Sequence, residues 1–76
     1  MKINVNKEDV FSSRGATMAI AATSAGYTLN YSVDGVNWSA YEEAVPANEN
    51  LVVTDMVQGM YFKLVGNADD NVIVKF

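Results

Sequence analysis

Residues 27–38 read YTLNYSVDGVNW and carry the clearest structural signal in the chain. Apolar and polar side chains alternate from residue 27 to residue 34, which is the period of a strand with one face on a core. Asp34-Gly35 is a favoured hairpin dipeptide, because glycine takes the positive φ of a tight turn at little cost. This stretch therefore predicts a β-hairpin whose return strand, residues 36–42, carries Trp38.

Strand signals recur on both sides of this hairpin. Four further segments have the composition of short strands: residues 2–6, 51–54, 60–65 and 72–76. Turn-forming residues lie between them, around the only proline, Pro46, around Gly59, and over residues 66–71. The polar stretch that follows residue 6 and the run 12–15 (SSRG) are expected to be loops.

Residues 16–25 fit two states. Met18 and the alanines at positions 16, 19, 21 and 22 favour a helix by intrinsic propensity. The β-branched residues Thr17, Ile20 and Thr23, in a run of only ten residues between two glycines, favour a strand instead. We expect a strand, with helix as the alternative.

About seven short strands with turn signals every 8–12 residues predict an all-β fold, a small sandwich or barrel. The prediction is one domain spanning residues 1–76. Its expected core is made by the apolar residues that share a strand face: Ile3, Val5, Met18, Ile20, Leu29, Tyr31, Val33, Trp38, Leu51, Val53, Phe62, Leu64, Val72 and Val74. Lys63 lies between two of these and is expected to point outward, as is Tyr61.

The composition argues against several classes of function. The 76 residues include no cysteine and no histidine, and the net charge is −4. Thiolate nucleophiles are therefore absent, and no hydroxyl has a histidine to activate it, so we expect no enzyme and no cofactor. The chain has no basic cluster of the kind that binds nucleic acid, and its apolar stretches are far shorter than a membrane span. We expect neither nucleic acid nor membrane as a partner.

Two groups of side chains have functional alternatives that we consider weaker. Residues 67–71 are rich in Asp and Asn and could hold a weak surface calcium ion, but a solvated turn is the better interpretation, and we expect no metal site. Five aromatic residues could form a platform on which sugars stack, although strand aromatics usually pack in the core: Tyr27, Tyr31, Trp38, Tyr41 and Tyr61. Tyr41 is the best outward candidate, because it opposes the phase of Trp38.

Several motifs resemble those of known families. The spacing Asp55-x-Val57-x-Gly59-x-Tyr61 resembles the turn into strand F of immunoglobulin-like and fibronectin-type sandwiches. That resemblance implies that the fold is a small immunoglobulin-like β-sandwich. Residues 31–38 (YSVDGVNW), 46–49 (PANE) and 60–67 (MYFKLVGN) together are similar to small virion proteins of tailed bacteriophages. That resemblance implies a non-enzymatic structural protein, a capsid decoration or cementing protein or a head-fibre component. It would be located in the virion after assembly in the host cytoplasm, in contact with the capsid or another virion protein.

Two other classes of function remain open. One is an immunoglobulin-like adhesion or carbohydrate-binding module, and the other is a small inhibitor or accessory subunit of one enzyme. We expect partner contacts at Phe11, Arg14, Tyr41 and Met56, because Tyr41 and Met56 are candidates for exposure and Phe11 has no obvious partner in the strand pattern.

The segment 7–26 suggests self-association. It mixes small residues, which allow a neighbouring backbone to approach closely, with Phe11 and Met18. An unpaired edge in this segment would favour a symmetric homo-oligomer, and the phage resemblance implies a trimer. The alternative is that Phe11 completes the core of its own monomer.

Overall fold

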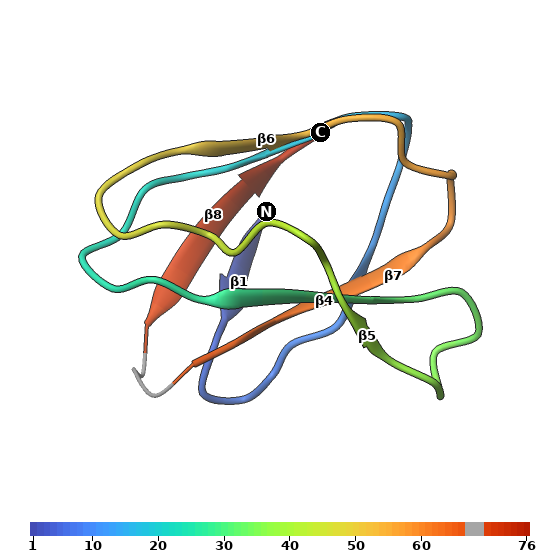
Figure 1. Ribbon diagram of the computed structural model, residues 1–76, viewed down its shortest axis with the longest axis horizontal. Coiled ribbons are helices and arrows are strands. Elements are labelled where there is room, and N and C mark those ends of the chain that lie inside the picture. Colours follow the sequence, from blue (N-terminus) through green and yellow to red (C-terminus); the bar gives the residue numbers. More distant parts are fainter. Residues whose placement is uncertain (67–69) are drawn as a thin grey trace.

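The computed structural model describes residues 1–66 and 70–76. Within these residues the regular structure is entirely β, and the strands are joined by loops (Figure 1). The strands are β1 (Lys2–Asn4), β2 (Phe11–Ser12), β3 (Met18–Ile20), β4 (Thr28–Ser32), β5 (Ser39–Ala40), β6 (Leu51–Val53), β7 (Tyr61–Val65) and β8 (Asn71–Lys75).

The strands form two four-stranded antiparallel sheets. The first has the order β1-β8-β3-β6 and the second has the order β2-β7-β4-β5. The pairs β1–β8, β2–β7, β3–β6 and β4–β5 are those of one long hairpin ribbon whose tip is the β4–β5 turn. Rolling that ribbon brings β8 beside β3 and β7 beside β4, which are the two remaining pairs. An eight-stranded double sheet wound in this way is a jelly roll.

The predicted all-β sandwich is confirmed, and two details go beyond the prediction. The described residues form eight strands rather than about seven. The additional strand is β2, which includes Ser12 from the run 12–15 that was expected to be a loop. The order of the strands also differs from that of immunoglobulin domains, whose sheets have the orders A-B-E-D and C-F-G. The ambiguous segment 16–25 contains a strand, β3, as expected, and the β-branched Ile20 lies fully buried in it.

The core lies between the two sheets. Eleven of the fourteen expected core residues are buried there. The buried apolar residues are Ile3, Val5, Phe11, Met18, Ile20, Tyr27, Leu29, Val45, Leu51, Val53, Phe62, Leu64, Val72 and Val74. Tyr61 is exposed and Lys63 is half-buried at the surface, where its ammonium lies 4.6 Å from the centre of the Trp38 ring and 3.5 Å from a carboxylate oxygen of Glu8.

Three expected core residues do not lie in the core. Val33 is 78% exposed, and Trp38 and Tyr31 are half-buried. Val33 and Trp38 lie outside the core because β4 ends at Ser32 rather than continuing into a two-residue turn, so the connection to β5 is a six-residue loop, residues 33–38. Tyr31 lies within β4, and its half-buried side chain packs against the core. Gly35 does have the positive φ that the hairpin dipeptide predicts, +80°.

Asp34 organises this loop. One oxygen of its carboxylate accepts hydrogen bonds from the backbone N–H groups of Asn37 and Val36 (both 2.8 Å) and from the Ser32 hydroxyl (2.9 Å). The other accepts one from the Asn37 amide. These bonds, the backbone N–H of Asn37 first, lower the pKa of Asp34 well below its ordinary value. The side chain thus draws the backbone away from the β4–β5 ladder.

Tyr27 and Val45 are core residues that the sequence analysis missed. An isolated antiparallel bridge pairs them beyond the β4–β5 ladder, with backbone hydrogen bonds of 2.7 and 2.9 Å in the two directions. The Tyr27 hydroxyl donates to a carboxylate oxygen of Asp70 at 2.6 Å. Burial, and then this hydrogen bond, raise the pKa of Tyr27. A phenol can therefore serve as a core residue because its polar tip has a partner.

Phe11 also belongs to the monomer's own core. It is 5% exposed, its ring stacks on Phe62 with centroids 5.9 Å apart, and Phe76 lies against it edge-on at 6.4 Å. The premise that Phe11 lacks a partner within the chain was therefore wrong, and the alternative of a completed monomer core is confirmed. Within the suggested self-association segment only β2 is an edge strand, because β3 lies between β8 and β6.

Candidate functional site

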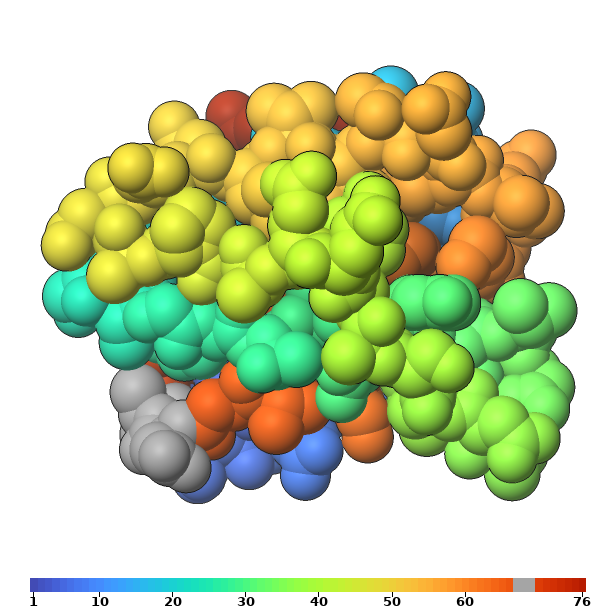
Figure 2. Space-filling view, viewed as in Figure 1, coloured from blue at the N-terminus to red at the C-terminus, as the bar shows by residue number. Residues whose placement is uncertain are grey.

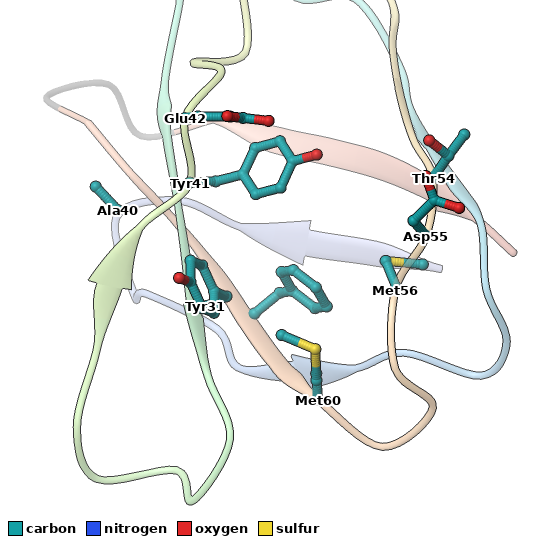
Figure 3. A pocket seen from close by; sticks show the side chains of 9 residues that line it. Tyr31, Ala40, Tyr41, Glu42, Thr54, Asp55, Met56 and Met60 are labelled. Atoms are coloured by element: carbon teal, nitrogen blue, oxygen red, sulfur yellow. The ribbon is translucent and has the colours of Figure 1, made fainter.

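The best-formed pocket of the described residues lies on the side of the sandwich where β5 and β6 end. Its volume is about 350 Å³. One wall is formed by residues 40–42, which are the last residue of β5 and the two residues after it (Figure 3). The opposite wall is the segment that follows β6, residues 54–56. In the space-filling view a hollow separates the yellow-green segment after β5 from the orange segment before β7 (Figure 2).

Two tyrosines form an aromatic corner of this pocket. Tyr31 comes from β4 and Tyr41 follows β5, and their ring planes meet at 84° with centroids 6.5 Å apart. The backbone N–H of Tyr41 donates to the Leu29 carbonyl at 2.7 Å, which fixes Tyr41 beside β4. Both side chains are half-buried and pack against the core. The corner is therefore held by the sheet itself.

Apolar side chains complete the inner surface. Phe62 from β7, which is 1% exposed, is one of the lining residues. Met56 and Met60 line the pocket as well (Figure 3). Met60 is fixed by the buried Ser13, whose backbone N–H donates to the Met60 carbonyl at 2.8 Å and whose hydroxyl accepts from the Met60 N–H at 3.1 Å. The backbone N–H of Met56 donates to the Ala16 carbonyl at 3.0 Å.

Carboxylates stand at the mouth of the pocket. Glu42 and Asp55 are exposed lining residues on opposite walls. Burial raises the pKa of Tyr41, and the negative charges of Glu42, Glu43 and Asp55 raise it further. None of the lining residues, all of which lie in the described part of the chain, is basic. The pocket is thus apolar inside and carries negative charge at its rim.

Of the four expected contact residues, the structure brings two together. Tyr41 and Met56 face each other across the pocket, and both are half-buried rather than fully outward. Arg14 is exposed elsewhere, with its guanidinium 5.3 Å from the centre of the Phe76 ring. Phe11 lies in the core, as described above.

Sequence reasoning missed most of the pocket. Glu42 was expected only as the end of the return strand 36–42, and Met60 only as the start of the strand segment 60–65. Tyr31 was assigned to the core because of its strand phase. These residues converge only because the rolled ribbon brings the ends of β5 and β6 to one side, and no local pattern in the sequence carries that information.

A second feature is the tip of the β4–β5 hairpin, residues 33–37, which we call the hairpin tip. It presents Val33 and Val36 to solvent, 78% and 77% exposed. The Asp34 hydrogen bonds hold its backbone, and Gly35 lies against the ring of Tyr61, which is itself 38% exposed. The loop is therefore ordered by polar contacts while its apolar side chains have no cover within the described chain.

Across residues 1–66 and 70–76, no three acidic side chains are grouped so that they could hold a metal ion. Most of the weak calcium turn considered above lies at residues 67–69, outside the described residues. In the same ranges no helix is long and apolar enough to cross a membrane.

Comparisons with protein-family models, with curated proteins and with solved structures gave no match.

Proposed function

We propose that this chain is a non-catalytic structural protein of a bacteriophage virion, a capsid decoration or cementing protein or a head-fibre component. The observation that carries the proposal is the hairpin tip, whose exposed Val33 and Val36 stand on a loop that Asp34 already holds in one conformation. An ordered loop loses little conformational entropy when it binds, so its apolar side chains are suited to a permanent contact.

The topology supports the same class of function. Jelly-roll double sheets are found in viral capsid domains and in lectins, and the rolled ribbon of this chain has that order. This is an analogy at the level of fold, because one fold serves many functions. Among the functions found on this fold, a virion role is favoured by the resemblance to small tailed-phage virion proteins, which is carried by residues 31–38, 46–49 and 60–67.

Self-association is part of the proposal, with a trimer as the expected state. The segment 7–26 no longer supports self-association through Phe11 or β3, since Phe11 is buried and β3 has neighbours on both sides. The number three comes from the phage resemblance. Sedimentation equilibrium at micromolar concentration should give three times the chain mass, and a monomer mass across the concentration range would contradict this part of the proposal.

The presence of the chain in particles tests the proposal as a whole. Phage particles from the source of the sequence are banded by density, washed in high salt and digested for quantitative mass spectrometry. We expect the chain to be present in a fixed ratio to the major capsid protein across the gradient. Its absence from intact particles, while it is abundant in the infected cells, would overturn the virion proposal.

A carbohydrate-binding module is the second candidate, and Tyr31 and Tyr41 favour it because both line one pocket with carboxylates at its rim. Aromatic rings and acidic groups are common partners of sugar rings and hydroxyls. Against it, the two rings meet at 84° and do not form the flat platform on which a sugar ring stacks. A glycan array separates the two candidates, since only the carbohydrate-binding module gives saturable binding to a defined glycan.

A further inference from the structure

The pocket between β5 and β6 combines three properties that select one kind of ligand. Its inner surface is aromatic and thioether, its rim is negatively charged, and none of its lining residues is basic. Its volume, about 350 Å³, is at the lower end of the range found for small-molecule sites, roughly 300–1,000 Å³. Such a space accommodates a small group or one side chain rather than an extended ligand.

The aromatic corner favours a cation. The face of a phenol ring carries negative electrostatic potential, and a cation within about 6 Å of the ring centre is attracted to it. Because Tyr31 and Tyr41 meet at nearly a right angle, a compact group in the corner contacts both rings at once. Phe62 adds a third ring to the lining of the pocket.

The rim points to the same charge. Glu42 and Asp55 stand on opposite walls of the mouth, and the net charge of the whole chain is −4. An anion would be repelled by both carboxylates. A neutral apolar group would fill the interior but would draw the carboxylates out of water without a compensating partner. A cation with apolar substituents fits both the interior and the rim.

We propose that this pocket binds an alkylated ammonium group, with its methyl or methylene substituents against Tyr31, Tyr41 and the two methionines and its charge between Glu42 and Asp55. This site is independent of the virion proposal, because it needs no contact through the hairpin tip. Two sources have this chemistry, a small free cation such as choline and a methylated lysine side chain.

The four methionines of the chain provide the assay. Met56 and Met60 line the pocket, whereas Met18 is buried in the core and Met1 is exposed at the N-terminus. Protein labelled with ¹³C at the methionine methyl groups is titrated with choline and, separately, with its neutral carbon isostere 3,3-dimethyl-1-butanol. We expect choline to shift the Met56 and Met60 signals saturably at millimolar concentration while Met1 and Met18 stay unchanged.

The isostere separates charge from shape. It has the same branched apolar end without the charge, and we expect it to bind about tenfold more weakly than choline. Equal binding of the two compounds would overturn the proposal and leave a merely apolar pocket. No shift of either pocket methionine with choline would also overturn it, as would saturable shifts produced by a sugar but not by choline.

Matched variants test the named groups. Tyr41→Leu keeps an apolar side chain but removes one ring, and we expect choline affinity to fall about tenfold. Tyr61→Leu, an exposed tyrosine outside the pocket, is the control and should bind choline as the unaltered protein does. Unchanged affinity in Tyr41→Leu would contradict the proposal.

A charge variant provides a second test of the proposal if Tyr41→Leu fails to fold. Glu42→Gln combined with Asp55→Asn removes both rim charges at exposed positions, and asparagine tolerates the positive φ of residue 55, 59°. We expect weaker choline binding that no longer depends on salt concentration. A short peptide with trimethyl-lysine, compared with choline at equal concentration, then identifies the source, because the source that binds more tightly is the better ligand.

Discussion

The burial of Phe11 leads to a prediction that distinguishes a core residue from an interface residue. Replacing a buried phenylalanine with alanine typically costs about 3–5 kcal/mol of unfolding free energy. Phe11 is 5% exposed, but it lies on a two-residue edge strand where neighbours can relax, so we expect the lower end, about 3 kcal/mol. Part of that loss is the stacking on Phe62, about 0.5–1.5 kcal/mol beyond burial.

This loss is large for a chain of this size. Stabilities of about 0.05–0.15 kcal/mol per residue give roughly 4–11 kcal/mol for 76 residues. Phe11→Ala should therefore remove between about a quarter and three quarters of the total stability. Phe11→Leu retains most of the apolar surface, and we expect it to cost about 1 kcal/mol.

Urea unfolding followed by the fluorescence of Trp38, the only tryptophan, measures both variants. Sedimentation equilibrium on the same samples measures their association state. We expect the urea midpoint of Phe11→Ala to be the lowest and that of Phe11→Leu to lie between it and the midpoint of the unaltered protein. The association state of the folded protein should be unchanged. A leucine variant with an unaltered midpoint but a changed mass would refute this reasoning, because it would assign Phe11 to an interface.

Three further predictions concern the loops. The pKa of Asp34 is depressed in the folded state, so its contribution to stability is present above the ordinary pKa, about 4, and is lost as the pH falls further. The difference in urea midpoint between the unaltered protein and Asp34→Asn should therefore narrow from pH 7 to pH 2.5. A constant difference would contradict the hydrogen-bonded loop. Gly35→Val should lower the unfolding free energy by about 1–3 kcal/mol through backbone strain at its positive φ, because a Cβ there meets only the Tyr61 ring, at 3.6 Å. Gly15→Val is the control, at an open position without positive φ, and should lower the urea midpoint far less. Tyr27→Phe should lose about 1 kcal/mol because it removes the hydrogen bond to Asp70, and an unchanged urea midpoint would indicate that solvent replaces this bond without cost.

The strands were predictable because alternation is a local property. Leu29, Phe62 and Val74 each lie at the buried phase of a segment whose pattern is visible in five or six residues. The ambiguous β3 could be assigned for the same reason, since Ile20 fits a strand better than a short helix. Burial on a strand face is thus encoded over the length of the strand.

The loop between β4 and β5 shows where local reasoning fails. The alternation runs on through Val33, and nothing in the pattern says that Ser32 and Asp34 will hydrogen-bond to each other and to the backbone. That side-chain network ends the strand two residues early and leaves Val33 in solvent. Competition between side-chain and ladder hydrogen bonds is decided by geometry that the sequence pattern does not contain.

The pocket could not be predicted for a different reason. Tyr31, Tyr41 and Met56 come from three segments, and their meeting depends on which strands pair after the ribbon is rolled. Pairing of β7 with β4 and of β8 with β3 joins residues 29 to 56 positions apart along the chain. Strand composition constrains such distant pairings only weakly, so the candidate residues were identified singly and not as a site.

Co-sedimentation with phage particles tests most directly the claim that the hairpin tip makes the virion contact. Particles stripped of the chain are mixed with purified protein and pelleted, and the bound chain is quantified. The double variant Val33→Ser, Val36→Ser should remain folded and fail to pellet, whereas Val10→Ser, which replaces a valine 55% exposed outside the tip, should pellet like the unaltered protein. Equal pelleting of the double variant and the unaltered protein would contradict the account.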